Sequence, residues 1–390
     1  MPDSEKPRIA FLAHERGDAR VVKRIAAFRD QGWELLGFTF HRERGKADVP
    51  PAWHNIHLGT TYNRRYFQRL LAILRATFVI WRHRGDLAQC KAIYAINTDN
   101  ALLALLGRFF SGRAVPLVLE LADVQPVMTG TGLAAEILRA IERFVLRRTA
   151  LLVTTSPGFV REYFDKLQQY QGEVFLLENK VYPSATLPPP AGETHPVKNG
   201  KPWVVGCFGA LRCRRSLTMM RAIAERLGEE KIRFVLRGYP AGTLGGEFDE
   251  LIAGIPNLGF EGPYIYPDDL ASIYGGVDFN WAIDESAPGG NSAWLLPNRI
   301  YEGGLFLVPA VAAKDTETGR WVASNSLGWT FEEPLVESIA AFFESLDVSA
   351  WAAVKQACSA HSRDGFTGEE DYTRLSSRLA ELKRTANRVQ

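Results

Sequence analysis

Short apolar runs alternate with amphipathic, helix-length segments along most of the chain, and this alternation constrains the fold more than any other feature. Residues 8–13 (RIAFLA) predict a buried strand, 19–31 a helix that ends at Gly32, and 33–40 a second strand. A strand, a helix and a strand within roughly 30 residues are typical of a right-handed parallel βαβ unit.

The same rhythm continues and then restarts. In the first part, further strands are expected at 91–96, 115–121, 150–156 and 173–179, with helices over 99–111, 133–148 and 157–169. In the second part, strands are expected at 203–211, 232–238, 257–262, 277–283 and 305–313, with helices over 216–228, 247–253, 267–275, 297–304 and 334–345. The pattern predicts an α/β protein with two Rossmann-like, doubly wound parallel-sheet domains.

A proline-rich break separates the two parts. Residues 183–202 hold six prolines and few large apolar residues, so we interpret them as an interdomain linker. This gives an N-terminal domain over 1–182 and a C-terminal domain over 203–365. The polar end, 366–390, carries an apolar stripe and is expected to form a closing helix that packs on one of the domains, with the first as the candidate.

Charge is distributed unevenly between the two halves. Residues 1–180 hold 26 Lys and Arg against 18 Asp and Glu, a net charge of +8, whereas the remaining residues hold 20 against 26, a net charge of −6. A basic half suggests an anionic partner, and because no nucleic-acid-binding motif is present, an anionic membrane surface is favoured over nucleic acid. The start of the chain does not read as a signal peptide, and the four scattered cysteines indicate reduced thiols, so a cytoplasmic protein is expected.

Ligands of open parallel sheets bind beyond the carboxyl ends of the strands. Neither the G-x-G-x-x-G dinucleotide fingerprint nor a P-loop follows any expected strand, which disfavours dehydrogenases and P-loop NTPases. Instead, Gly209 follows the apolar run VVGCF and precedes three arginines, of which Arg212 and Arg215 are the candidates for binding a diphosphate at the next helix start. The alternative is that these arginines simply cover a solvated turn.

Later strand ends offer candidates for binding a nucleoside. Gly238 and Tyr264 each lie in a turn after a strand, and Asn298 and Arg299 stand at a helix start. Glu302, one turn into that helix, can accept hydrogen bonds from ribose hydroxyls; alternatively, it only interacts favourably with the helix dipole.

These residues carry a family resemblance. The run from Gly209 to Leu217 resembles the phosphate loop of two-domain (GT-B) retaining glycosyltransferases of group 1, also called family 4. The segments NLGFEGPYIYPDDLASIYGGVDF and LLPNRIYEGGLFLVPAVAA are similar to two further elements of that family, as is GDARVVKRIAAFRDQGWEL in the first domain. Bacterial exopolysaccharide glycosyltransferases of the succinoglycan type are the group that the chain resembles most.

The resemblance implies roles for several residues. Arg215 takes the place of the lysine that neutralises the donor diphosphate, with Arg212 beside it, and Glu302 matches the ribose-binding acid. Backbone groups near Tyr264 and Ile265 would hold the base. We expect Arg212, Arg215 and Glu302 to surround one shared pocket. The chain departs from the family where Trp294 replaces the first acid of its Glu-x7-Glu motif and Ala210 replaces an arginine.

The first domain supplies the catalytic candidates. Asp123 follows the strand at 115–121 and can act as a general base, Glu120 lies within that strand, and His14 follows the first strand. Each has an alternative as a capping or hydrogen-bonding loop residue. No pattern indicates a metal site, so no metal or other cofactor is expected.

Residues 62–85 contain six arginines and no acid. On a helix, Phe67, Leu70, Leu71, Leu74, Phe78 and Trp81 would form one apolar stripe bordered by arginines, which is typical of a helix lying on an anionic membrane. The alternative is a helix that turns this stripe toward the domain core.

The chain is therefore expected to transfer a hexose or hexuronic acid from a UDP- or GDP-sugar to a hydroxyl of a polyprenyl-diphosphate-linked glycan in exopolysaccharide synthesis, at the inner face of the cell membrane. Two alternatives stay open: a nucleotide-sugar epimerase of the same fold, and a catalytically silent GT-B partner subunit.

Overall fold

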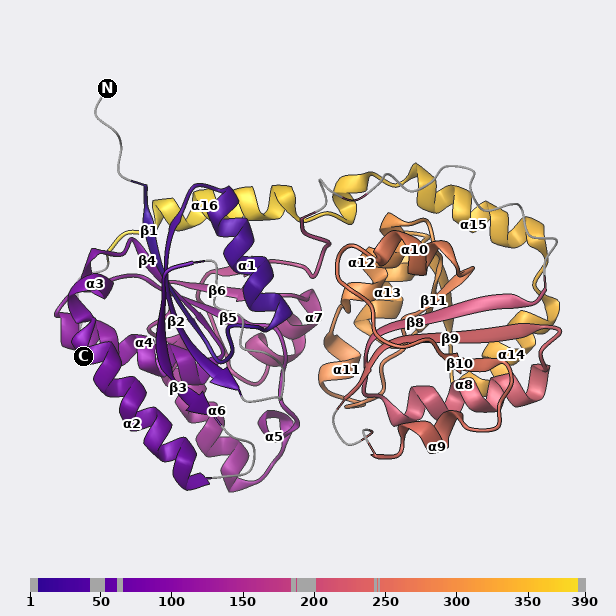
Figure 1. Ribbon diagram of the computed structural model, residues 1–390, viewed down its shortest axis with the longest axis horizontal. Helices are drawn as coiled ribbons and strands as arrows, with labels where there is room; N and C mark the ends of the chain where they lie inside the picture. Colours follow the sequence, from indigo (N-terminus) through magenta and orange to yellow (C-terminus); the bar gives the residue numbers. More distant parts are fainter. Residues whose placement is uncertain are drawn as a thin grey trace. The chain divides into compact units, whose positions relative to one another are not determined.

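The computed structural model describes residues 6–42, 53–61, 66–183, 187, 201–241, 244 and 246–384, and the chain forms two compact units (Figure 1). Unit 1 comprises 1–155, 160–177 and 369–390, and unit 2 comprises 156–159 and 178–368. The change between units thus falls after Leu177 rather than after residue 182, and the end of the chain groups with unit 1. Most of the expected linker, 183–202, lies outside the described residues.

Unit 1 is built on a seven-stranded parallel sheet in the order β3-β2-β1-β4-β5-β6-β7. Its strands are β1 (Arg8–Ala13), β2 (Glu34–Arg42), β3 (Asn55–Thr61), β4 (Ala92–Ile96), β5 (Leu117–Leu121), β6 (Leu151–Thr154) and β7 (Val174–Leu176). The central strands β1, β4 and β5 are buried almost throughout, as expected for a parallel sheet covered on both faces.

Helices cover both faces of this sheet. They are α1 (Ala19–Asp30), α2 (Tyr66–Arg82), α3 (Arg84–Gln89), α4 (Thr98–Ser111), α5 (Pro126–Thr129), α6 (Leu133–Leu146) and α16 (Glu369–Glu381). The strand order runs from β1 in opposite directions toward β3 and β7, so right-handed crossovers put α1 on one face and α4 and α6 on the other. Helix α16 packs against α1, whereas α2 packs against α4 (Figure 1).

Unit 2 has a six-stranded parallel sheet in the order β10-β9-β8-β11-β12-β13. Its strands are β8 (Trp203–Leu211), β9 (Ile232–Pro240), β10 (Leu258–Phe260), β11 (Phe279–Trp281), β12 (Ala310–Ala313) and β13 (Gly328–Phe331). Its α-helices are α7 (Pro157–Phe159), α8 (Arg214–Leu227), α9 (Phe248–Ile252), α10 (Leu270–Gly275), α11 (Asn291–Trp294), α12 (Asn298–Leu305), α13 (Glu317–Ser324), α14 (Leu335–Ser345) and α15 (Val348–Ala360).

The predicted fold of two doubly wound parallel sheets is confirmed. Two kinds of detail differ. The helix expected over 157–169 is the short α7 followed by a π-helix at Val160–Asp165, and the elements β3, α3, α5, α11, α13, β13 and α15 were not predicted. Among the described residues, no helix combines the length and apolar character that crossing a bilayer requires.

Candidate functional site

Two glycines shape the end of β8 in unit 2. Gly209 and Gly238 are paired in the β8–β9 register, with φ angles of +111° and +127°. A Cβ atom at Gly238 would lie 1.9 Å from the carbonyl oxygen of Gly209, so only glycine allows the two strands to approach so closely. By contrast, a Cβ at Gly209 would meet only the Tyr264 hydroxyl, at 3.9 Å.

Helix α8 begins three residues after the end of β8. Its N-cap is Cys213, whose Sγ accepts a hydrogen bond from the Ser216 backbone N–H at 3.3 Å. The remaining first-turn N–H groups and the helix dipole make this end of α8 favourable for negative charge.

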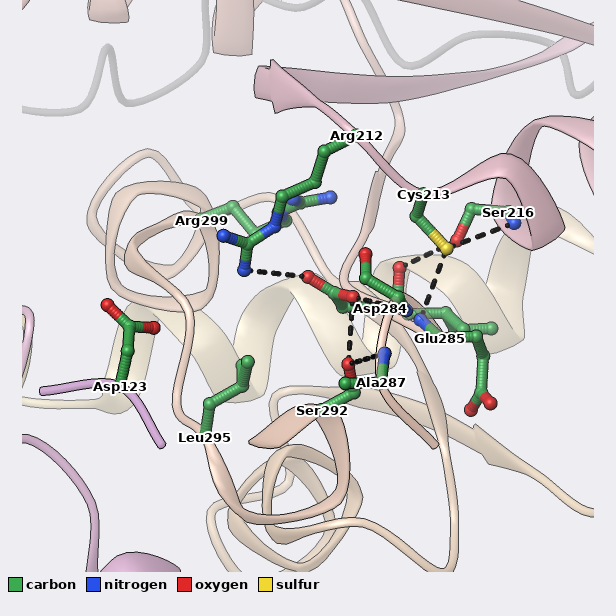
Figure 2. Close-up of polar contacts among 12 residues, drawn as sticks. Asp123, Arg212, Cys213, Ser216, Asp284, Glu285, Ala287, Ser292, Leu295 and Arg299 are labelled. Atoms are coloured by element: carbon green, nitrogen blue, oxygen red, sulfur yellow. Dashed lines mark hydrogen bonds and ion pairs between the residues drawn. The ribbon is translucent and has the colours of Figure 1, made fainter. Parts of the chain in front are cut away.

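A small pocket opens beside the start of α8 (Figure 2). Two guanidinium groups, those of Arg212 and Arg299, line it together with the carboxylate of Asp284, and the remaining lining residues are Cys207, Ala210, Leu211, Cys213, Ser216, Leu217 and Ile283. Arg212 Nη2 donates to Asp284 Oδ2 at 3.2 Å (Figure 2). The pocket therefore carries two positive charges and one negative charge.

Asp284 is fixed in its ionised form. Its Oδ1 accepts hydrogen bonds from the Ser286 N–H at 2.8 Å and from the Ser292 hydroxyl at 3.0 Å. Burial opposes ionisation, but these bonds and the charges of Arg212 and Arg299 outweigh it and lower the pKa of Asp284 to about 2. The carboxylate is thus negative at any physiological pH.

Arg299 reaches the pocket from the start of α12. Its Nη1 donates to the Trp281 carbonyl at 3.1 Å and to Cys207 Sγ at 3.4 Å. Burial lowers the pKa of Arg299, but its neighbours Cys207, Asp284, Tyr274 and Glu302 together raise it by a larger amount, so the guanidinium stays charged. The sequence suggested Arg299 for nucleoside binding, whereas the structure places it beside Arg212.

The expectation that Arg212, Arg215 and Glu302 surround one pocket is wrong. Arg215 forms ion pairs with Glu285, at 3.2 Å, and with Glu333, and it is not among the residues that line the pocket. Glu302 is only 4% exposed and accepts a hydrogen bond from the Tyr274 hydroxyl at 2.9 Å. Arg299, not Arg215, is the second cation of this pocket.

The turn after β10 uses its own backbone groups. The N–H of Ile265 donates to the Asp269 carboxylate at 2.7 Å, and the carbonyl of Ile265 accepts from the Asp269 N–H at 2.9 Å. Both backbone groups of Ile265 are thus engaged within the turn, and the expected role of the backbone near Tyr264 and Ile265 in holding a base stays a prediction. Tyr264 is partly buried beside Gly209, and Asn298 is exposed at the first position of α12.

Unit 1 brings two catalytic candidates to one end of its sheet. Asp18 caps α1 by accepting from the Arg20 N–H at 2.9 Å, and its other carboxylate oxygen lies 3.6 Å from His14 Nε2. Arg20 donates through Nη2 to Asp123 at 2.9 Å. The side chains of His14 and Asp123 are 29% and 47% exposed, so both remain accessible to a ligand.

Glu120 is a structural residue, and its assignment as a catalytic candidate is wrong. Its side chain is completely buried, pairs with Arg24 at 3.0 Å and accepts from the Tyr94 hydroxyl at 2.5 Å. Burial alone would raise the pKa of Glu120. The charge and hydrogen bonds of Arg24 lower it by a larger amount, so the pKa lies below its ordinary value and the acid stays ionised. A sealed carboxylate of this kind cannot take a proton from a substrate.

Sequence reasoning missed Asp284. The available signal was an acid directly after the apolar strand pattern VDFNWAI, at the edge of the sheet where ligands bind. In the described part of the chain, no three His, Cys, Asp or Glu side chains are grouped to hold a metal ion.

Comparison with known proteins gives the chain a curated relative. The chain is 35% identical over 356 residues to the succinoglycan biosynthesis protein ExoL of Rhizobium meliloti (strain 1021). The aligned region spans 88% of this chain and 86% of that protein. The chain belongs to the ExoL family. The predicted membership of the succinoglycan-type exopolysaccharide glycosyltransferases is thereby confirmed, as is sugar transfer in exopolysaccharide synthesis as its general activity. No protein-family model matches this chain.

Solved structures share the fold of this ExoL-family chain. The sucrose-phosphate synthase of Thermosynechococcus elongatus superimposes with a TM-score of 0.69 at 14% identity, covering 96% of this chain and 98% of that one. Anabaena HepE in complex with UDP and glucose gives 0.65 at 17% identity, with 96% and 100% covered. WaaG, a glycosyltransferase involved in lipopolysaccharide biosynthesis, gives 0.65 at 14% identity, also with 96% and 100% covered. The GT-B fold is confirmed.

Proposed function

We propose that the chain transfers a hexose or hexuronic acid from a UDP- or GDP-sugar to a hydroxyl of a polyprenyl-diphosphate-linked glycan. The observation that carries this proposal is the pocket at the start of α8, where Arg212 and Arg299 face one small space. Two guanidinium groups beside a helix N-terminus suit a diphosphate because both features favour negative charge there.

The pocket assists departure of the nucleoside diphosphate. As the bond from the sugar to the diphosphate breaks, negative charge grows on the leaving oxygen and positive, oxocarbenium-like charge grows on the sugar ring. Arg212, Arg299 and the N-terminus of α8 offset the first charge. In this proposal no cofactor takes part, because protein groups carry the charge neutralisation.

Asp284 supplies an acid to this site. The first acid of the family motif is replaced by Trp294, whereas Asp284 lies in the pocket and remains ionised. A carboxylate there can accept hydrogen bonds from hydroxyls of the donor sugar. We assign Asp284 this role.

The general base belongs to unit 1 in this proposal. Asp123 and His14 both lie at carboxyl ends of strands and remain partly exposed. Either can accept the proton of the acceptor hydroxyl. Asp123 is the first choice because its side chain is the more exposed of the two, 47% against 29%.

One structural relative supports the choice of donor. HepE has been solved with UDP and with UDP-glucose. The proposed place of action is the cytoplasmic face of the cell membrane, where a polyprenyl-linked acceptor and a nucleotide sugar are both accessible.

A donor screen tests the proposal. The full chain is incubated with UDP-glucose, UDP-glucuronic acid, GDP-mannose and a lipid-linked acceptor, and nucleoside diphosphate and glycolipid product are measured in a single turnover. Transfer with at least one donor is expected. An altered nucleotide sugar without transfer would instead identify an epimerase, and absence of both UDP and GDP binding would identify a silent partner subunit.

A further inference from the structure

One face of unit 1 consists of three neighbouring helices. Helix α2 packs against α4, and α4 packs against α6, on the side of the sheet opposite α1 and α16 (Figure 1). Their inner sides supply the core contacts through buried residues such as Ala76, Ile80, Leu103 and Val145. The outer sides are therefore not needed to complete this core.

Those outer sides are nevertheless apolar. Phe109 is 79% exposed and Leu133 is 73% exposed, which is unusual for side chains of this size. The exposed large apolar residues of the three helices are Leu74, Phe78, Trp81, Leu106, Phe109, Leu133, Ile137, Leu138, Ile141 and Phe144. We call this set, spread over three adjacent helices, the apolar face. An exposed apolar set of this size on neighbouring helices is typical of an interaction site.

Arginines accompany the apolar face. Arg84 lies over the Trp81 ring, at 4.9 Å from its centroid, and Arg148 lies over the Phe144 ring at 3.8 Å. Exposed Arg75 and Arg82 on α2 and Arg147, directly after α6, add further positive charge. The acids there contribute less: Asp99 and Glu136 are exposed in the first turns of α4 and α6, but Glu142 is buried and bound by Tyr163, Thr98 and Gln168.

We propose that the apolar face docks unit 1 on an anionic lipid bilayer. The apolar side chains would enter the boundary between headgroups and acyl chains, while the arginines bind lipid phosphates. Charge favours this occupant over a second copy of the chain. A symmetric self-contact would bring like-charged arginine rows together, whereas a lipid surface supplies the opposite charge.

This surface is wider than the helix predicted from the sequence. Of the predicted stripe, Leu74, Phe78 and Trp81 are exposed, so the alternative of a stripe turned into the core does not hold for them. The side chains of Phe67, Leu70 and Leu71 lie outside the described residues. Helices α4 and α6 supply the rest of the face, and this inference does not depend on which nucleotide sugar unit 2 binds.

Vesicle flotation of the full chain tests the inference. We expect binding to vesicles of phosphatidylglycerol and phosphatidylethanolamine, and much weaker binding to vesicles of phosphatidylcholine alone. The variant Phe109→Ser/Leu133→Ser/Ile137→Ser should lose roughly tenfold or more of the partition into anionic vesicles, because it removes apolar surface that is already exposed. These substitutions leave the core intact, which a circular-dichroism melt verifies.

Val22→Ser is the matched control. Val22 is 45% exposed on α1, on the opposite face of the sheet, so its replacement should leave vesicle binding unchanged. Absence of wild-type binding, or equal binding by the triple variant, would overturn the inference. So would light scattering that shows a wild-type dimer which the triple variant converts to monomer. None of these readouts uses sugar transfer, so they are independent of the proposed function.

Discussion

Arg212 and Asp284 form an ion pair, 3.2 Å between Nη2 and Oδ2, inside the pocket at the start of α8. The aspartate side chain is 5% exposed and the arginine side chain 44% exposed. The buried acid thus fixes one side of a guanidinium whose other side remains open to a ligand. Arg299 adds a second positive charge to the same pocket.

The ionisation of Asp284 predicts a pH dependence of stability. Its pKa falls from an ordinary 3.8 to about 2 on folding, so the ionised form stabilises the folded state by about 2 kcal/mol above pH ~4. This stabilisation is lost as the pH falls from about 4 to about 2. In thermal melts, Asp284→Asn should therefore flatten the decline of Tm over this range. Asp249→Asn, at an exposed acid, should leave the decline unchanged; identical curves for wild type and Asp284→Asn would contradict the prediction.

The buried pair of Arg24 and Glu120 is expected to stabilise unit 1 strongly. Replacing only one partner leaves an unpaired buried charge, so Arg24→Met should lower the free energy of unfolding by about 3–5 kcal/mol in urea. Arg24 also donates to the Tyr372 hydroxyl of α16, so the variant should loosen that helix in hydrogen exchange. Arg233→Met removes an exposed pair with Glu261 and should cost about 1 kcal/mol or less. Equal effects of the two variants would count against this role.

Close packing of Gly238 on Gly209 predicts that Gly238 tolerates no side chain. In Gly238→Ala the new Cβ would meet the Gly209 carbonyl, at a φ where non-glycine residues are strained. We expect a loss of about 2 kcal/mol or more in unfolding free energy and weaker UDP binding. Gly259→Ala in β10, where a Cβ meets nothing within 4 Å, is the control. If Gly238→Ala is as stable as the wild type, the backbone at the ends of β8 and β9 adapts to the new side chain, and the prediction is contradicted.

The assignment of Asp123 as general base predicts a kinetic effect without loss of donor affinity. Asp123→Asn should reduce kcat about 100-fold or more, while the Kd for UDP stays unchanged. Asp86→Asn, at another exposed acid of unit 1, should retain activity. If Asp123→Asn is fully active and His14→Ala is not, the base is His14.

Much of the fold could be predicted because buried parallel strands are apolar throughout. RIAFLA and WVVGCFGAL correspond to β1 and β8 with their bounds intact. Strand β3 was missed because NIHLGTT, at the edge of its sheet, has polar residues on a partly exposed strand. Helix α15 was missed because VSAWAAVKQACSA buries only Trp351 and Cys358 and has a weak apolar periodicity.

The site could be predicted only in part. The position of the pocket followed from the strand-end rule: Arg212 lines it, and Gly209 directly precedes the lining residue Ala210. Which arginine faces the pocket depends on ion pairs formed with residues far along the chain. Glu285 and Glu333 hold Arg215 away from the lining, and no local pattern encodes those contacts.

Calorimetric titration of UDP and GDP into arginine variants tests the central claim most directly. If Arg212 and Arg299 bind the donor diphosphate, Arg212→Ala and Arg299→Lys should each weaken the preferred nucleotide by roughly tenfold or more, about 1.5–3 kcal/mol. Lysine is chosen at position 299 because it keeps a positive charge next to Trp281 and Cys207, which Arg299 contacts. Arg215→Ala is the control: the Arg215 side chain already forms ion pairs with two acids, so its loss should weaken nucleotide binding less. Loss of binding in Arg215→Ala with unchanged binding in the other two variants would contradict the account.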